Sequence, residues 1–245
     1  MARLAASTYL TAGEAIVWLG PPAAPLHPRA ILVPEAVAGD GDDVAIDVGT
    51  LVPWRPPTIT LDRAAAGMAR TAWRRLAMDL AALGAPAGFG ARLAGARLTF
   101  PLDRAAAAAH ALAGACARDD AAAAADAALG LLGLGAGLTP SGDDFVGAAF
   151  FARRALADGG SADGRAWRDA ADAVLAAAPE RTHPISVALL GDLAAGVGHA
   201  PLHDLVAALA ADRHADAVDA ARRLVRLGHT SGWDMLAGLV AGLSG

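Results

Sequence analysis

The sequence Gly-Leu-Leu-Gly-Leu-Gly-Ala-Gly-Leu-Thr-Pro-Ser-Gly-Asp-Asp-Phe-Val-Gly, residues 130–147, is the one stretch of the chain that demands a special backbone. Its glycines at positions 130, 133, 135 and 137 permit positive φ angles or a close approach of backbones. Pro140 disfavours the α region at Thr139, so we expect extended chain up to this point and a helix from Ser141. The stretch predicts a glycine-rich loop that leads into a helix N-terminus.

The polar residues at this junction predict a binding site. Ser141 as N-cap and Asp144 three residues later form a capping-box pattern, which leaves Asp143 without a structural explanation. Free N–H groups and the helix dipole attract an anion to such a helix start. We therefore expect an anionic metabolite to bind here, with the following candidate binding residues: Gly135, Gly137, Thr139, Ser141 and Gly142.

The adjacent carboxylates Asp143 and Asp144 are the candidate catalytic and metal-binding residues of this loop. Hard divalent cations prefer oxygen ligands and often keep several waters, so this pair beside hydroxyl groups favours Mg²⁺. A second interpretation, a well-capped helix after a flexible loop, accounts for Ser141 and Asp144 but not for Asp143.

A second copy of the pattern occurs near the C-terminus, in Leu-Gly-His-Thr-Ser-Gly-Trp-Asp, residues 227–234. Ser231 aligns with Ser141 at an offset of 231 − 141 = 90, and Trp233 replaces Asp143. Two helix dipoles aimed at one point would stabilise an anion, so we predict that both serine hydroxyls lie within about 15 Å of each other in one asymmetric pocket. The additional candidate binding residues are Thr230, Ser231, Gly232 and Asp234.

His229 is the one histidine inside either motif. Because histidine titrates near neutral pH, it is a candidate general base or anion ligand, and a structural cap is the alternative.

Together the two motifs resemble the bacterial family of AllH-type subunits of oxamate carbamoyltransferase. The family pattern Gly-Leu-Gly-x-Gly-Leu-Thr-Pro-Ser-Gly-Asp-Asp is intact at residues 133–144, and Gly-His-x-Ser-Gly is intact at residues 228–232. The middle element, residues 181–186, has His183 where the family has a second threonine. Arg181 is expected to pair with a substrate carboxylate, and Thr182 to contact the substrate.

The resemblance implies a subunit of an enzyme that exchanges oxalurate and phosphate with oxamate and carbamoyl phosphate during allantoin breakdown. It also implies partners, either other subunits of the carbamoyltransferase complex or further copies of the chain. Two alternatives stay open: a non-catalytic scaffold subunit that binds an anionic metabolite, and a metal-dependent hydrolase with carboxylates at its helix starts. Whether this chain is itself an enzyme stays open as well.

Composition and charge narrow the possible location of the protein and its possible classes of partner. The most apolar run, residues 105–116, is shorter than the roughly 20 residues that span a bilayer, so we expect no membrane partner. The N-terminal region lacks the continuous apolar segment of a signal peptide, so we expect a cytoplasmic protein. A formal net charge of −5 and the lack of a basic run argue against nucleic acid.

Hydrophobic periodicity changes near residue 61. Short β-favouring runs at 9–10, 15–19, 30–33, 44–48 and 58–61, separated by Gly, Pro and Asp, predict a small antiparallel β-sheet or barrel. From Asp62 the spacing becomes helical, with helices expected at about 141–157, 163–178, 183–195, 202–211, 215–227 and 231–243. We therefore predict an α+β fold with an N-terminal β domain, residues 1–61, and a larger all-helical domain, residues 62–245, which carries both helix starts.

Overall fold

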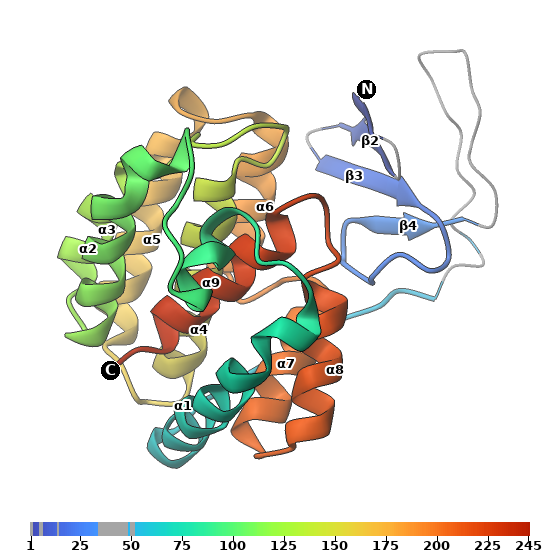
Figure 1. Cartoon of the computed structure of the whole chain (residues 1–245). Coiled ribbons are helices and arrows are strands. Elements are labelled where there is room, and N and C mark those ends of the chain that lie inside the picture. The colour runs from blue at the N-terminus through green and yellow to red at the C-terminus, as the bar shows by residue number, and fades with distance from the viewer. Residues whose placement is uncertain (1, 5–6, 14, 34–48, 50–51) are drawn as a thin grey trace. The chain divides into compact units, whose positions relative to one another are not determined.

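The computed structural model describes residues 2–4, 7–13, 15–33, 49 and 52–245 (Figure 1). The chain divides into two compact units, Met1–Pro57 and Thr58–Gly245. Leu61 packs with the helical unit, because its side chain is 1% exposed and its N–H donates to the Ala155 carbonyl at 2.8 Å. The last residues of the predicted β domain therefore belong to the helical core.

The N-terminal unit holds a four-stranded mixed sheet in the order β1-β2-β3-β4. The strands are β1 (Ala2–Leu4), β2 (Ser7–Ala12), β3 (Ala15–Gly20) and β4 (Ala30–Leu32). The antiparallel pairing of β2 with β3 is as predicted, and β1, which was not predicted, pairs antiparallel to β2. β4 pairs parallel to β3 instead, with Leu19 opposite Ile31. Four prolines between residues 21 and 28 prevent the connection between β3 and β4 from forming a strand. The chain therefore runs back along β3 before β4 begins, as parallel pairing requires.

One of the predicted strands is wrong. Residues 58–61 form no strand, and the run at 44–48 lies outside the described residues. The α+β class is confirmed nevertheless, because helices make up nearly all of the regular structure after residue 62.

The helical unit follows the predicted order of elements closely. Its α-helices are α1 (Arg63–Leu76), α2 (Ala106–Ala117), α3 (Ala121–Leu129), α4 (Ser141–Asp158), α5 (Gly164–Ala177), α6 (Pro184–Ala194), α7 (Ala200–Ala210), α8 (His214–Leu224) and α9 (Ser231–Leu243). Its 3₁₀ segments are η1 (Ala77–Leu83), η2 (Gly88–Ala94), η3 (Leu102–Ala105) and η4 (Ala178–Glu180). Among the described residues, no helix combines the length and apolar character needed to cross a membrane.

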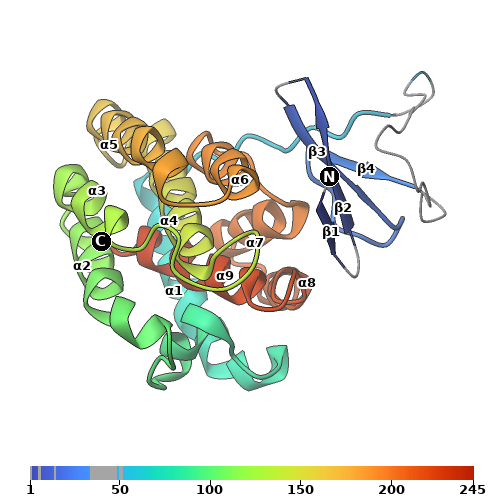
Figure 2. The same ribbon diagram turned by 90° about the horizontal axis from the view of Figure 1, so that it is seen from above.

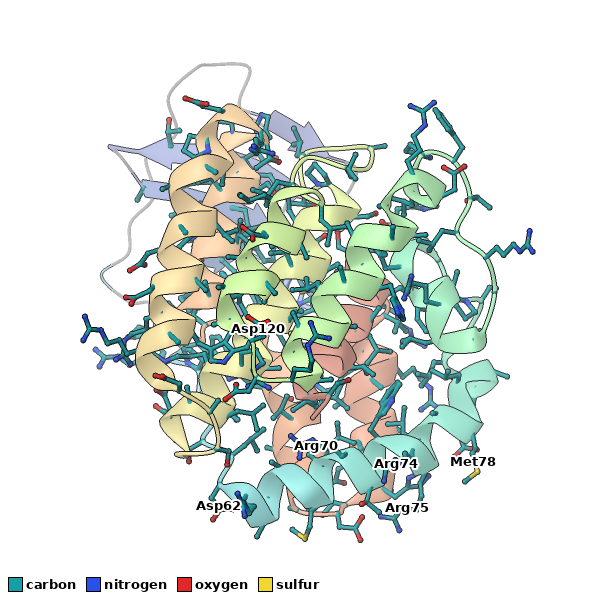
Figure 3. The ribbon with its side chains drawn as sticks, turned by 90° about the vertical axis from the view of Figure 1, so that its left-hand side faces the viewer. Asp62, Arg70, Arg74, Arg75, Met78 and Asp120 are labelled. Carbon is teal, nitrogen blue, oxygen red and sulfur yellow. The ribbon has the colours of Figure 1, made fainter. Side chains whose placement is uncertain are left out.

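Aspartate caps explain several of the helix starts. The carboxylate of Asp62 accepts the Ala65 N–H at 2.8 Å, and that of Asp120 accepts the Ala123 N–H at 3.1 Å. Figure 3 shows both aspartates at the starts of α1 and α3, with Arg74, Arg75 and Met78 farther along the α1 region. Each cap satisfies an N–H group that has no partner within its own helix.

Helices α4 and α9 occupy the middle of the helical unit (Figures 1 and 2). A Cβ added at Gly238 would overlap the Phe145 carbonyl, and one added at Gly242 would overlap the Ala149 carbonyl. The two helices therefore pack backbone against backbone. Gly147, which is also on α4, faces α6, where an added Cβ would lie 2.6 Å from a Leu193 methyl group.

Candidate functional site

The glycine-rich loop connects α3 to α4 and takes up backbone angles that favour glycine. The φ angles are +75° at Gly133, +125° at Gly135 and +94° at Gly137. Gly133 is also held against another segment, because an added Cβ would overlap the Arg181 carbonyl. Gly135 is half-buried and Gly137 is exposed. The predicted loop and helix start are therefore present, and the loop is anchored beside residue 181.

The predicted capping box is wrong. Helix α4 has Pro140 at its N-cap position and α9 has Thr230, and neither makes a side-chain capping bond. Ser141 and Ser231 are instead the first residues inside their helices, so their hydroxyls are free to point across to the other helix.

The two Ser-Gly-x-Asp motifs have the same local packing. A Cβ added at Gly142 would overlap the Leu131 carbonyl, and one added at Gly232 would overlap the Leu224 carbonyl. The N–H of Gly142 donates to the Leu134 carbonyl at 2.8 Å, and that of Gly232 donates to a carbonyl of its own loop at 3.0 Å. These two N–H groups are thus already bonded and do not face an anion at this junction.

The structure brings the two helix starts into direct contact through four hydroxyl groups. The Thr139 and Ser231 hydroxyl oxygens lie 3.2 Å apart, and those of Ser141 and Thr230 lie 3.1 Å apart. Each motif thus bonds to the other in a crossed arrangement. The proximity predicted for Ser141 and Ser231 is confirmed, because each serine contacts the threonine that belongs to the other's motif.

Asp144 and Asp234 form the buried centre of this junction. They are 6% and 0% exposed, and the Oδ2 atom of each is buried without a hydrogen-bond partner. Burial raises the pKa of Asp144 well above its ordinary value, and Asp234 and Asp143 raise it further, while the Ser231 hydroxyl lowers it. Burial likewise raises the pKa of Asp234 to about 6.

Smaller effects oppose the increase at Asp234. The Phe89 N–H donates to its Oδ1 at 2.6 Å, and the Ser141 and Thr230 hydroxyls also bond to the carboxylate, so all three lower its pKa. These contacts, with the Ser231 contact to Asp144, show that each carboxyl interacts with a serine from the other motif.

Asp143 has a complete set of structural partners. Its Oδ1 accepts the Gly133 N–H at 2.8 Å, and its Oδ2 accepts the hydroxyls of Thr182 and of Ser186, the latter at 2.6 Å. The side chain is 1% exposed. Asp143 therefore joins the glycine-rich loop to the start of α6, which explains the residue that the capping-box interpretation left over.

The η2 segment covers the start of α9, a contact that no pattern in the sequence indicates. Phe89 is fully buried and stacks on Phe145 with ring centroids 4.7 Å apart. An added Cβ at Gly90 would lie 2.8 Å from the Trp233 side chain. Trp233 is 4% exposed and is part of the helical core, so the second motif exchanges a carboxylate for a packing residue.

The other predicted residues lie nearer the surface. Arg181 is exposed and donates to the Leu129 carbonyl, the last of α3, at 2.9 Å. His229 is exposed. His183, which replaces the family threonine, is the N-cap of α6 and accepts the Ile185 N–H at 3.2 Å.

The donor set at the junction does not fit Mg²⁺. Within the part of the chain that the structure describes, no group of three or more His, Cys, Asp or Glu side chains could hold a metal ion. The oxygens of Asp143 are occupied by three donors, and the free Oδ2 of Asp144 has no surface for the waters that Mg²⁺ usually keeps. We therefore derive no chemistry at this site from a metal ion.

Comparison with known protein families gives a match over the C-terminal part of the chain. Residues 131–243 match the model of a family described as oxamate carbamoyltransferase subunit AllH. This segment begins in the glycine-rich loop and ends with α9, so it contains both helix starts. The resemblance drawn from the two motifs is confirmed over these residues. Curated proteins and solved structures give no significant match.

Proposed function

We propose that the chain is a subunit of an oxamate carbamoyltransferase-like enzyme and that the α4–α9 junction binds its small-molecule substrate. The reaction is the exchange of oxalurate and phosphate with oxamate and carbamoyl phosphate. One observation carries the proposal: two helix starts within the family-matched segment meet at four hydroxyls and two buried carboxyls.

The groups at the junction suit a substrate that has both an amide and a carboxylate. Such a molecule needs donors for its oxygens and acceptors for its N–H groups. A threonine hydroxyl can serve as either, and Thr139 and Thr230 are both half-buried at the junction. Because the N-termini of α4 and α9 are both here, their dipoles favour a substrate with negative charge.

Two exposed side chains are proposed for the charged end of the substrate. Arg181 immediately precedes Thr182, which bonds to Asp143, and His229 immediately precedes Thr230. A guanidinium pairs well with a carboxylate or phosphate, and a histidine can take or give a proton near neutral pH. We propose that the phosphate or carboxylate is held by these two residues, while the amide lies against the hydroxyls.

One observation favours a second candidate, a subunit that binds the metabolite without carrying out chemistry. The unpartnered Oδ2 atoms of Asp144 and Asp234 have almost no accessible surface, so a substrate cannot touch them without movement of their neighbours. Both candidates predict binding at the junction, and only turnover separates them.

The test measures carbamoyl phosphate formed from oxalurate and phosphate by the chain purified together with its partner subunits. Thr230→Val keeps the shape of the side chain but removes its hydroxyl, and we expect it to lower the rate at least about tenfold. Ser244→Ala, at the end of α9 away from the junction, is the matched control, because its hydroxyl donates to the Val240 carbonyl. Wild-type activity in Thr230→Val would contradict the proposal, whereas oxamate binding without turnover would favour the non-catalytic subunit.

A further inference from the structure

The outer face of α1 combines apolar side chains with arginines. The buried side of this helix is made of small and apolar residues: Ala66, Ala69, Ala72 and Leu76. On the other side Met68 is 45% exposed, and Met78, in the η1 segment that follows α1 directly, is 80% exposed. Methionine side chains adapt their shape to a partner, so they suit protein-binding surfaces. Figure 3 shows α1 at the edge of the helical unit, with Arg74, Arg75 and Met78 along it.

A groove of about 450 Å³ opens on this face, and its lining includes Arg63, Gly67, Met68, Thr71 and Arg75. Asp212, in the turn after α7, also lines the groove and forms an ion pair with Arg75. The Thr71 hydroxyl donates to the Gly67 carbonyl of its own helix at 3.0 Å. This hydroxyl is therefore satisfied within α1, which leaves the groove mostly apolar between its charged side chains.

Gly67 lies in the middle of α1, where a glycine costs up to about 1 kcal/mol relative to alanine. Gly238 and Gly242 have a structural reason, because an added Cβ would overlap a neighbouring backbone. Among the helices that the structure describes, Gly67 is the one glycine whose added Cβ would meet nothing within 4 Å. A partner helix packed closely in the groove would give Gly67 the role that Gly238 has inside the chain.

The charge of α1 indicates what kind of partner fits. The helix has four arginines and no acidic residue, although the whole chain has a formal net charge of −5. Arg70 and Arg75 are bonded within the chain, whereas Arg63 and Arg74 have no ion pair with any residue that the structure describes. Unpaired arginines beside an apolar groove favour a partner segment that carries carboxylates.

A second copy of the chain does not fit this face well. A two-fold contact through α1 would place the same arginines opposite one another, and like charges across an interface repel. Residues 131–243 match a family of enzyme subunits, which favours a different chain as the partner.

We propose that the outer face of α1 docks an acidic helix from a different subunit of the carbamoyltransferase-like complex. The identity of this partner rests on the proposed function, but the docking surface uses none of the junction residues. Arg70, in the middle of α1, donates to the Leu243 carbonyl at 2.6 Å, at the end of α9 opposite to the helix start that forms the junction.

The dissociation constant between the full chain and its purified partner subunits, measured at low salt, tests the proposal. Arg74→Glu should weaken binding at least about tenfold, because it brings a negative charge against carboxylates. Arg168→Glu, which reverses an exposed arginine on α5, is the matched control and should bind as the wild type does.

Gly67→Gln tests the close approach of the partner helix. Its side chain fills the space that the partner needs, so binding should weaken at least about tenfold. The free chain should keep its melting temperature, because the groove has room for the new side chain in the absence of a partner. If either Gly67→Gln or Arg74→Glu binds as tightly as the wild type, or if Arg168→Glu weakens binding as much, α1 is not the docking surface.

Cross-linking identifies the occupant of the groove. Thr71→Cys places a thiol there, and Cys116, the one cysteine of the chain, is fully buried and cannot react. A photo-cross-linker on the new thiol should join the chain to an acidic helical segment of another subunit. Asp126→Cys, on the exposed side of α3, should give no such product. A product that joins two copies of the chain, or no product, would overturn the inference.

These outcomes are separable from those of the proposed function. If the α1 variants bind as expected but the wild-type complex forms no carbamoyl phosphate, the proposed function fails and the docking surface stands. If the wild-type complex forms carbamoyl phosphate and the α1 variants bind as the wild type does, the docking surface fails and the proposed function stands.

Discussion

The Ser141 hydroxyl oxygen lies 3.1 Å from the Thr230 hydroxyl oxygen, although 89 residues separate them in the sequence. This contact is possible because the first turns of α4 and α9 meet, with glycine as the second residue of each helix. It makes two similar helix starts parts of one structural unit.

The close packing of α4 on α9 predicts that Gly238 cannot carry a side chain. An added Cβ would overlap the Phe145 carbonyl, so Gly238→Ala should lower the free energy of unfolding by more than about 2 kcal/mol, measured by urea denaturation. Gly67→Ala is the control: position 67 is exposed within α1, and an added Cβ would meet nothing within 4 Å. The control should gain about 0.5–1 kcal/mol, and equal effects at the two positions would refute the packing account.

The hydrogen bonds of Asp143 predict that it stabilises the fold. Asp143→Ala leaves the Gly133 N–H and two hydroxyls without their acceptor, so the free energy of unfolding should fall by more than about 3 kcal/mol. Ser186→Ala removes one of these donors and should cost about 1 kcal/mol. Thermal unfolding measures both, and an Asp143→Ala variant as stable as the wild type would show that the network contributes little.

The raised pKa of Asp234 predicts a pH-dependent loss of stability. An acid whose pKa rises from 3.8 to about 6 on folding holds its proton in the folded state between these pH values after the unfolded state has released it. The free energy of unfolding therefore falls as pH rises from about 4 to about 6, by about 3 kcal/mol from this group. Asp234→Asn should remove this part of the pH dependence. A difference between wild type and variant that stays constant from pH 4 to 7 would contradict the account.

The sequence predicted the elements of the helical unit well because its signals there are local. Proline at 140, the aspartates at 62 and 120, and the spacing of apolar residues each act within a few positions. The repeated motif even allowed the meeting of Ser141 with the second helix start to be predicted, since similar starts on paired helices converge.

What the sequence did not reveal depends on contacts between distant segments. Asp143 could be taken for a ligand-binding residue because its three donors come from the glycine-rich loop, from the turn before α6 and from α6 itself, which no local pattern connects. The Phe89 N–H that bonds to Asp234 lies 145 positions away in a 3₁₀ segment. The parallel pairing of β4 was missed for the same reason, because it depends on the path of residues 21–29.

The central claim is that both helix starts belong to one binding site, and the rise in melting temperature on adding oxamate tests it most directly. Ser141→Ala removes the hydroxyl contact with Thr230, and Ser231→Ala removes the hydroxyl contact with Thr139. The double variant removes both contacts. Ser244→Ala, outside the junction, serves as the control. A ligand that binds only the folded protein raises its apparent stability, so the wild type and Ser244→Ala should show the same rise.

We predict that either serine substitution alone removes most of the rise in melting temperature caused by oxamate. The double variant should lose little more, because one ligand depends on both hydroxyl contacts. If Ser141→Ala or Ser231→Ala keeps the full wild-type rise while the other loses it, the two helix starts do not share a site.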